Sequence, residues 1–111
     1  MPEKVLPKTL DETYTFLDSW FEKNERMYIK AMSKRDLWKL HSTIGRKLRN
    51  DLGLWGKSEL KDYFTELGVS HPDEISGIIL RAYWAKMNSY TLNLEEEIKY
   101  CIEIDKENGH Y

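Results

Sequence analysis

Hydrophobic side chains recur along the 111-residue chain with the three- and four-residue spacing of amphipathic helices. After Thr9, the residues Leu10, Tyr14 and Leu17 would share one helical face. Thr9 can cap this helix, and Glu12 stands three residues later, where a capping box needs a carboxylate. No segment alternates apolar and polar residues around a hairpin turn, so we expect no strands.

The segment 34–52 predicts one continuous helix, opened by Ser33 and ended by Gly53. Gly45 lies in the middle of this helix, where glycine costs about 1 kcal/mol relative to alanine, and we expect a close helix crossing there. At about 100° per residue, one arc of the helix collects apolar side chains and one histidine, namely Leu37, Leu40, His41, Ile44, Leu48 and Leu52.

The second half of the chain predicts further helices. Residues 57–67 form a short one, and His71-Pro72-Asp73 is typical of a helix start, because proline is favoured in the first turn. The helix that follows, at about 73–88, is apolar on nearly all sides, which indicates that neighbouring helices enclose it. We therefore predict an all-α fold, a compact bundle of five or six short helices around this buried central helix.

Length and composition fit a single helical domain over residues 1–111, with residues 1–8 and 108–111 as frayed ends. Apolar residues make up 41% of the chain, which is enough for a core and excludes a disordered protein. Seventeen basic and nineteen acidic residues leave a net charge of −2. This balance argues against a surface that binds nucleic acid as a whole, although it leaves room for a local basic patch.

The chain has the features of a cytoplasmic protein. Cys101 is the only cysteine, so no disulfide can form within the chain and a reducing compartment is expected. No apolar run approaches the roughly 20 residues of a membrane helix. Residues 1–7 lack the apolar core of a signal peptide. We therefore expect no membrane partner.

His41 and His71 are the candidates for acid–base or metal chemistry. His41 falls on the apolar arc, where it is either a functional histidine or, as we favour, a core histidine with one hydrogen bond. His71 and Asp73 could supply two metal ligands, but zinc needs three or four, so a helix cap is the better interpretation. There is no glycine-rich phosphate loop and no Gly-x-Ser-x-Gly motif. The sequence predicts no catalytic residue, no metal and no cofactor.

Two features are candidates for binding a partner. Arg35, Lys39, Arg46 and Arg49 recur on one side of the helix predicted above, either as a phosphate-binding stripe or, more commonly, as a solvated face. Trp55 stands after a helix end, either as an exposed anchor for a partner or as a plug between two helices. The plug is the commoner arrangement.

The most specific motifs lie in the middle of the chain: His41, Gly45, Arg49-Asn50, Leu52-Gly53-Leu54-Trp55, His71-Pro72-Asp73, Ser76, Ile78-Ile79 and Trp84. Together they resemble a family of short helical bacterial and phage proteins catalogued as a domain of unknown function. Glu74 departs from the family pattern, in which a second aspartate usually follows Pro-Asp. The last helix, beyond Asn88, looks like an extension. The resemblance implies an all-helical domain but no activity, because none is assigned to the family.

Some of these motif residues form a candidate polar cluster. They flank the end of one predicted helix and the start of the central one. If these two helix ends meet, Arg49 can pair with Asp73. A closed arrangement would be a structural lock, whereas an open cleft would be a ligand site. The members of the cluster are His41, Arg49, Asn50, His71, Asp73 and Ser76.

The main hypothesis is a non-catalytic helical protein that binds another protein in a bacterial or phage setting. It rests on the small size, the absence of catalytic motifs, the near-neutral charge and aromatic residues such as Trp55 that the core does not need. The alternative is a nucleic-acid-binding module that uses the basic stripe of helix 34–52. A third hypothesis is an enzyme that uses His41 or His71. The candidate partner-binding residues are Trp55, Arg35, Lys39 and Arg46.

Overall fold

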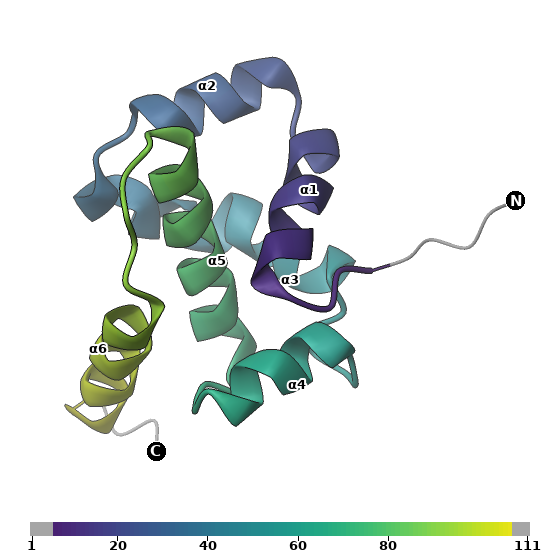
Figure 1. Cartoon of the computed structure of the whole chain (residues 1–111), viewed down its shortest axis with the longest axis vertical. Coiled ribbons are helices and arrows are strands. Elements are labelled where there is room, and N and C mark those ends of the chain that lie inside the picture. The colour runs from purple at the N-terminus through teal and green to yellow at the C-terminus, as the bar shows by residue number, and fades with distance from the viewer. Residues whose placement is uncertain (1–5, 108–111) are drawn as a thin grey trace, which may run out of the picture.

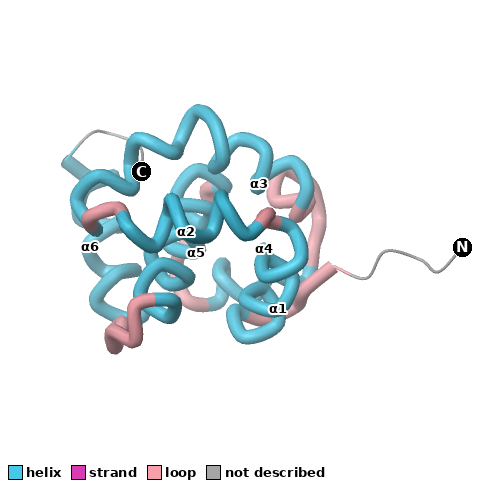
Figure 2. Tube along the Cα trace, turned by 90° about the horizontal axis from the view of Figure 1, so that it is seen from above, coloured by secondary structure: helices cyan, strands magenta, loops and turns pink. Residues whose placement is uncertain are grey.

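The computed structural model describes residues 6–107, which fold as α-helices and two irregular helical segments without any strand. The predicted all-α class is confirmed. Figure 1 shows the elements arranged around one central helix, and Figure 2 shows that short loops connect them. In chain order they are α1 (Leu10–Trp20), α2 (Lys23–Ala31), the 3-10 helix η1 (Lys34–Leu40), the π-helical turn η2 (His41–Gly45), α3 (Arg46–Asp51), α4 (Glu59–Glu66), α5 (Pro72–Met87) and α6 (Leu94–Glu107).

Helix α5 is the central element, as the apolar pattern at about 73–88 predicts. It packs against every other α-helix and against both irregular segments. Because Leu80 is buried as well as Ile78 and Ile79, the helix has no fully solvated side along its middle. Tyr83 completes its core surface, and its hydroxyl donates to Asp18 Oδ1 of α1 at 2.7 Å.

Two predicted helix starts are confirmed by their caps. Thr9 Oγ1 accepts a hydrogen bond from Glu12 N at 3.3 Å. At the start of α5, His71 Nδ1 accepts one from Asp73 N at 3.1 Å, and Pro72 occupies the first turn. His71 is therefore a helix cap, as the sequence indicates.

The prediction of one continuous helix at 34–52 is wrong. The segment winds as η1, then η2, then α3, and Ser33 makes no side-chain cap. A 3-10 helix has three residues per turn, so Leu37 and Leu40 lie above one another and are both buried. The next side chain, His41, is turned away and is 50% exposed. The interpretation of His41 as a core histidine is therefore wrong as well.

Gly45 is buried in the irregular segment for a reason other than the expected helix crossing. A Cβ at this position would lie 3.1 Å from Arg49 Nη1 and 3.2 Å from the Leu40 carbonyl oxygen. The glycine thus makes room for a side chain and a carbonyl group of its own segment.

The expected frayed ends, 1–8 and 108–111, lie outside the described residues except for residues 6–8. Among those three, Pro7 is buried, so the packed part of the chain begins before α1. Within residues 6–107, none of the helices combines the length and the apolar character that crossing a membrane requires.

Gly53 ends α3 with φ +68°, the left-handed conformation expected at this position. Gly53→Ala should lower the free energy of unfolding by about 1–2 kcal/mol, because a Cβ disfavours this conformation. Gly56→Ala is the matched control, since Gly56 lies in the same loop and a Cβ there would face open space. Urea titrations measure both variants, and equal effects would contradict the explanation.

Candidate functional site

Arg49 is the centre of the polar cluster, and only 5% of this residue is exposed. Its guanidinium reaches from α3 to both η2 and α5. Nη1 donates to Ser76 Oγ at 3.0 Å, and Nη2 donates to the His41 carbonyl oxygen at 3.1 Å. Ser76 Oγ in turn donates to the Asp73 carbonyl oxygen at 3.0 Å. One buried side chain therefore joins three segments of the chain.

The carboxylate of Asp73 supplies the opposite charge. Its Oδ1 lies 3.3 Å from Arg49 Nε, so the two groups form an ion pair. The Nε–H group does not point at this oxygen, and Nε is a buried nitrogen without a hydrogen bond among the described residues. Asp73 Oδ2 lies 3.8 Å from His41 Nε2 and 3.9 Å from His71 Nδ1. The expected pairing of Arg49 with Asp73 is present, through charge rather than through a hydrogen bond.

Both histidine rings have an occupied Nδ1 atom. His41 Nδ1 lies 3.4 Å from Arg49 Nη1 and accepts from it, because a guanidinium only donates. His71 Nδ1 accepts from Asp73 N. A neutral imidazole has one acceptor nitrogen, so neither ring has a free one to take a proton from a substrate. The geometry favours structural roles for both rings.

The same side chains do not form a metal site. Among the side chains that the structure describes, which end at residue 103, no group of histidine, cysteine and carboxylate groups could hold a metal ion. Beside His41, His71 and Asp73, the positive charge of Arg49 would also repel a cation.

Of the six residues in the predicted polar cluster, Asn50 stands apart, because it is exposed on α3. The others converge. The Arg49 side chain is 6% exposed, whereas those of Asp73, His41 and His71 are between 40% and 50% exposed. The cluster is therefore a structural lock on its inner side and an open surface on its outer side.

A groove of about 580 Å³ opens beside the cluster, between η1, η2, α5 and α6. His41, Asp73 and Ser76 form its polar end, and Leu37 and Leu80 form its apolar floor. The volume is within the range of ligand-binding pockets. Because the three polar residues already interact within the Arg49 cluster, the groove offers mainly apolar contact.

Two aromatic side chains line this groove from opposite elements. Trp38 of η1 is 70% exposed, and Tyr100 of α6 is 60% exposed. Both also line a second groove of about 820 Å³, which shares Arg81 with the first. We call the two together the Trp38–Tyr100 groove. Neither Trp38 nor Tyr100 is among the partner-binding residues predicted from the sequence. Each lies outside the apolar stripe of its helix, and this position could have indicated an exposed aromatic side chain.

Glu97 of α6 lies in the wall of the groove and is 8% exposed. Lys34 of η1 and Arg81 of α5 both donate hydrogen bonds to its carboxylate. Burial on its own would raise the pKa of Glu97, but the hydrogen bond from Lys34 and the charge of Arg81 outweigh it and hold the pKa below its ordinary value. Arg81 Nη2 also donates to Cys101 Sγ at 3.3 Å.

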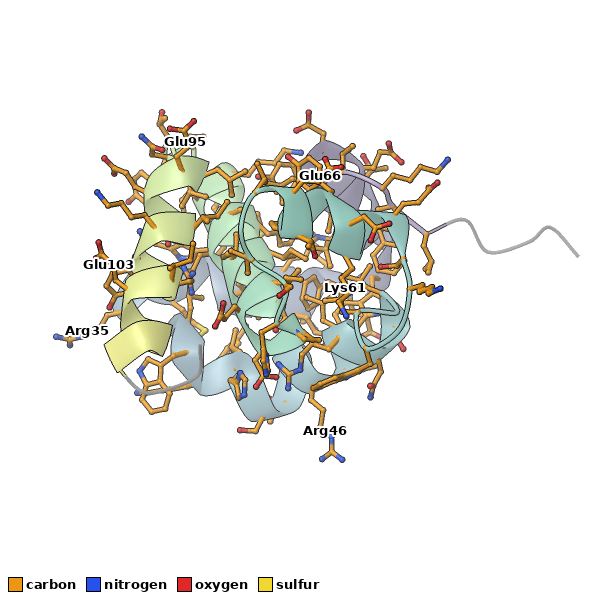
Figure 3. The ribbon with its side chains drawn as sticks, turned by 90° about the horizontal axis from the view of Figure 1, so that it is seen from below. Arg35, Arg46, Lys61, Glu66, Glu95 and Glu103 are labelled. Carbon is orange, nitrogen blue, oxygen red and sulfur yellow. The ribbon has the colours of Figure 1, made fainter. Side chains whose placement is uncertain are left out.

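The predicted basic stripe is not a continuous surface. Arg49 faces inward in the cluster described above. Lys39 pairs with Asp36, at 3.6 Å between Nζ and Oδ1. Arg35 and Arg46 are exposed and project in different directions (Figure 3).

Trp55 lies on the surface beside the polar cluster. It is 57% exposed, and its ring meets the ring of His71 edge-on with 6.4 Å between centroids. The neighbouring Leu54 is the residue that fills the interior. The interpretation of Trp55 as a plug between helices is therefore wrong, and the residue stays a candidate for partner binding.

One protein-family model covers most of the folded chain. It is described as Domain of unknown function (DUF6794) and matches residues 6–87. The chain belongs to this family. The DUF6794 match ends with α5, so α6 lies outside it. No curated protein and no solved structure matches the chain.

Arg49→Lys should lower the free energy of unfolding by about 2 kcal/mol, because lysine keeps the charge but loses the fork that reaches Ser76 and the His41 carbonyl group. Arg46→Lys makes the same chemical change on an exposed side chain of the same helix and should have nearly no effect. Thermal and urea unfolding measure both. Equal stability of the two variants would contradict the role of Arg49.

The depressed pKa of Glu97 makes stability depend on pH. Its contribution is present above the ordinary glutamate value of 4.5 and is lost as the pH falls through the lower folded value. Glu97→Gln should cost about 1.5–3 kcal/mol at pH 7 and flatten the loss of stability below pH 4.5. Urea titrations between pH 7 and pH 3 check this. Parallel curves for the wild type and the variant would disprove it.

Proposed function

We propose that this protein acts without catalysis by binding another protein, in the cytoplasm of a bacterial or phage system. The observation that carries the proposal is the Trp38–Tyr100 groove. Tryptophan and tyrosine are enriched among the residues that dominate binding energy, especially around an apolar floor that a partner can desolvate. Leu37 and Leu80 provide such a floor, and both rings are exposed beside it.

The Arg49 cluster supports this proposal by holding one end of the groove rigid. Binding is tighter when the receiving surface is ordered beforehand, since less conformational freedom is lost on association. Arg49 orders His41 and Ser76 through hydrogen bonds and holds Asp73 by charge. The partner we expect therefore inserts an apolar or aromatic side chain into the groove, with Trp55 as an additional contact on the far side of His71.

The observations give less support to the two other hypotheses. General-base catalysis by His41 or His71 lacks a free acceptor nitrogen on either ring. Nucleic-acid binding through the basic stripe loses Arg49, which is buried, and the remaining exposed arginines point in different directions. Phosphate binding along a backbone favours cations that line one surface.

Site-specific photo-crosslinking tests the proposal in cells that naturally make the protein. A photoreactive amino acid in place of Lys39, which lines the groove, should give a defined protein adduct. The same amino acid in place of the exposed Lys30 on α2 is the control and should not give this adduct. Nuclease treatment should leave the adduct unchanged, because a nucleic-acid partner would be degraded.

Competition with unlabelled protein measures the role of the aromatic wall. Trp38→Ala should need roughly 30-fold more competitor than the wild type to suppress the adduct, as expected for a dominant binding residue. Tyr28→Ala removes a similarly exposed aromatic ring on α2 and should compete like the wild type. Equal competition by both variants, or no adduct at Lys39, would refute the proposal.

A further inference from the structure

We propose that α6 is a hinged wall of the Trp38–Tyr100 groove, which moves away from α5 while the rest of the domain stays folded. Helix α6 contributes Tyr100 and Cys101 to the groove beside the Arg49 cluster. Its movement widens that groove and uncovers more of the apolar floor. The opening is a property of the fold, whereas its use to admit a partner rests on the proposed function.

The core of the domain depends little on α6. Within the described chain, the buried core residue from α6 is Ile98, while Leu94, Cys101 and Ile102 are only partly buried. The DUF6794 match ends at residue 87, so the family model does not include α6. Elements with few buried apolar contacts open locally at a lower free energy than the core does.

The connection between α5 and α6 has the features of a hinge. Asn88 fixes the end of α5, because its Nδ2 donates to the Trp84 carbonyl oxygen at 2.9 Å and to the Lys30 carbonyl oxygen at 3.1 Å. The next residue, Ser89, has φ +58°, and Tyr90 N donates to the Ala85 carbonyl oxygen at 2.8 Å, so these two residues close the C-terminal end of α5. Residues 90–93 then lead to α6 without regular structure. A backbone change within residues 91–93, which follow this helix end, therefore redirects α6 without disturbing α5.

Glu97 holds α6 in the closed position. Its carboxylate accepts hydrogen bonds from Lys34 of η1 and Arg81 of α5, so it connects α6 to two other elements of the domain. Arg81 Nη2 also donates to Cys101 Sγ, one helical turn further along α6. Loss of the negative charge at Glu97 releases both cations at once and removes the main polar attachment of α6 between these elements.

Amide hydrogen exchange of the full chain, followed by mass spectrometry, tests the hinge. In the wild type, the open state through which the amides of residues 94–103 exchange should be at least about tenfold more populated than the open state that exposes residues 75–83 of α5. Glu97→Gln should raise the α6 opening and the global opening that exposes α5 by the same factor of about tenfold or more, because the Glu97 bonds are broken in both. The α6 opening should therefore stay at least about tenfold more populated than that of α5 in the variant as well. Glu103→Gln changes an exposed carboxylate that projects outward from α6 (Figure 3) and should change neither helix.

Cys101 allows a second measurement that needs no variant. It is the only cysteine of the chain and is partly buried, so a thiol reagent labels it faster when α6 opens. The labelling rate should depend on urea much more weakly than global unfolding does, because local opening exposes little surface. Labelling that follows global unfolding, or α6 and α5 amides that exchange through one common opening, would each overturn the hinge. If α6 opens but no protein crosslinks at Lys39, the result supports the hinge and contradicts the proposed protein-binding function.

Discussion

The buried guanidinium of Arg49 is the interaction on which the arrangement of the central segments depends. A charge that is almost fully removed from water is tolerated only where its N–H groups meet acceptors and an opposite charge lies close. Ser76, the His41 carbonyl group and the Asp73 carboxylate provide these. They belong to η2 and to the first turns of α5, so a single side chain of α3 fixes the place where these segments meet. Gly45 belongs to the same constraint, because any larger residue there would approach the guanidinium.

The sequence predicts those parts of the fold that short-range chemistry decides. The cap at Thr9 and the left-handed end at Gly53 each depend on residues within about one helical turn, and both are found where expected. The winding of η1 and η2 is not predicted in this way. The spacing of Leu37 and Leu40 fits an α-helix as well as a 3-10 helix. In the structure Arg49 donates a hydrogen bond to the His41 carbonyl group, eight residues earlier, which the i to i+4 pattern of an α-helix does not contain.

The candidate site likewise has one part that the sequence predicts, the polar cluster, and one part that it does not, the groove. The polar cluster can be predicted because its motif residues stand at two helix ends, and pairing a buried arginine with a nearby aspartate is physically required. Asn50 shares the motif but not the cluster, since it is exposed on α3. The groove could not be predicted, because it exists only where α6 brings Tyr100 near Trp38. That placement is set by Glu97 and its two cationic partners, which are distant in sequence.

The two walls of the groove differ in how they are tied to the rest of the domain. Trp38 belongs to η1, which packs on α5 within the residues that define the family, whereas Tyr100 stands on a helix outside them. Substitutions on the groove-facing side of α6 can therefore change the shape of the groove while the Arg49 cluster and the core stay intact. The domain is modular in this sense: the family match covers the scaffold and the Arg49 cluster, and α6 adds to it the wall that carries Tyr100.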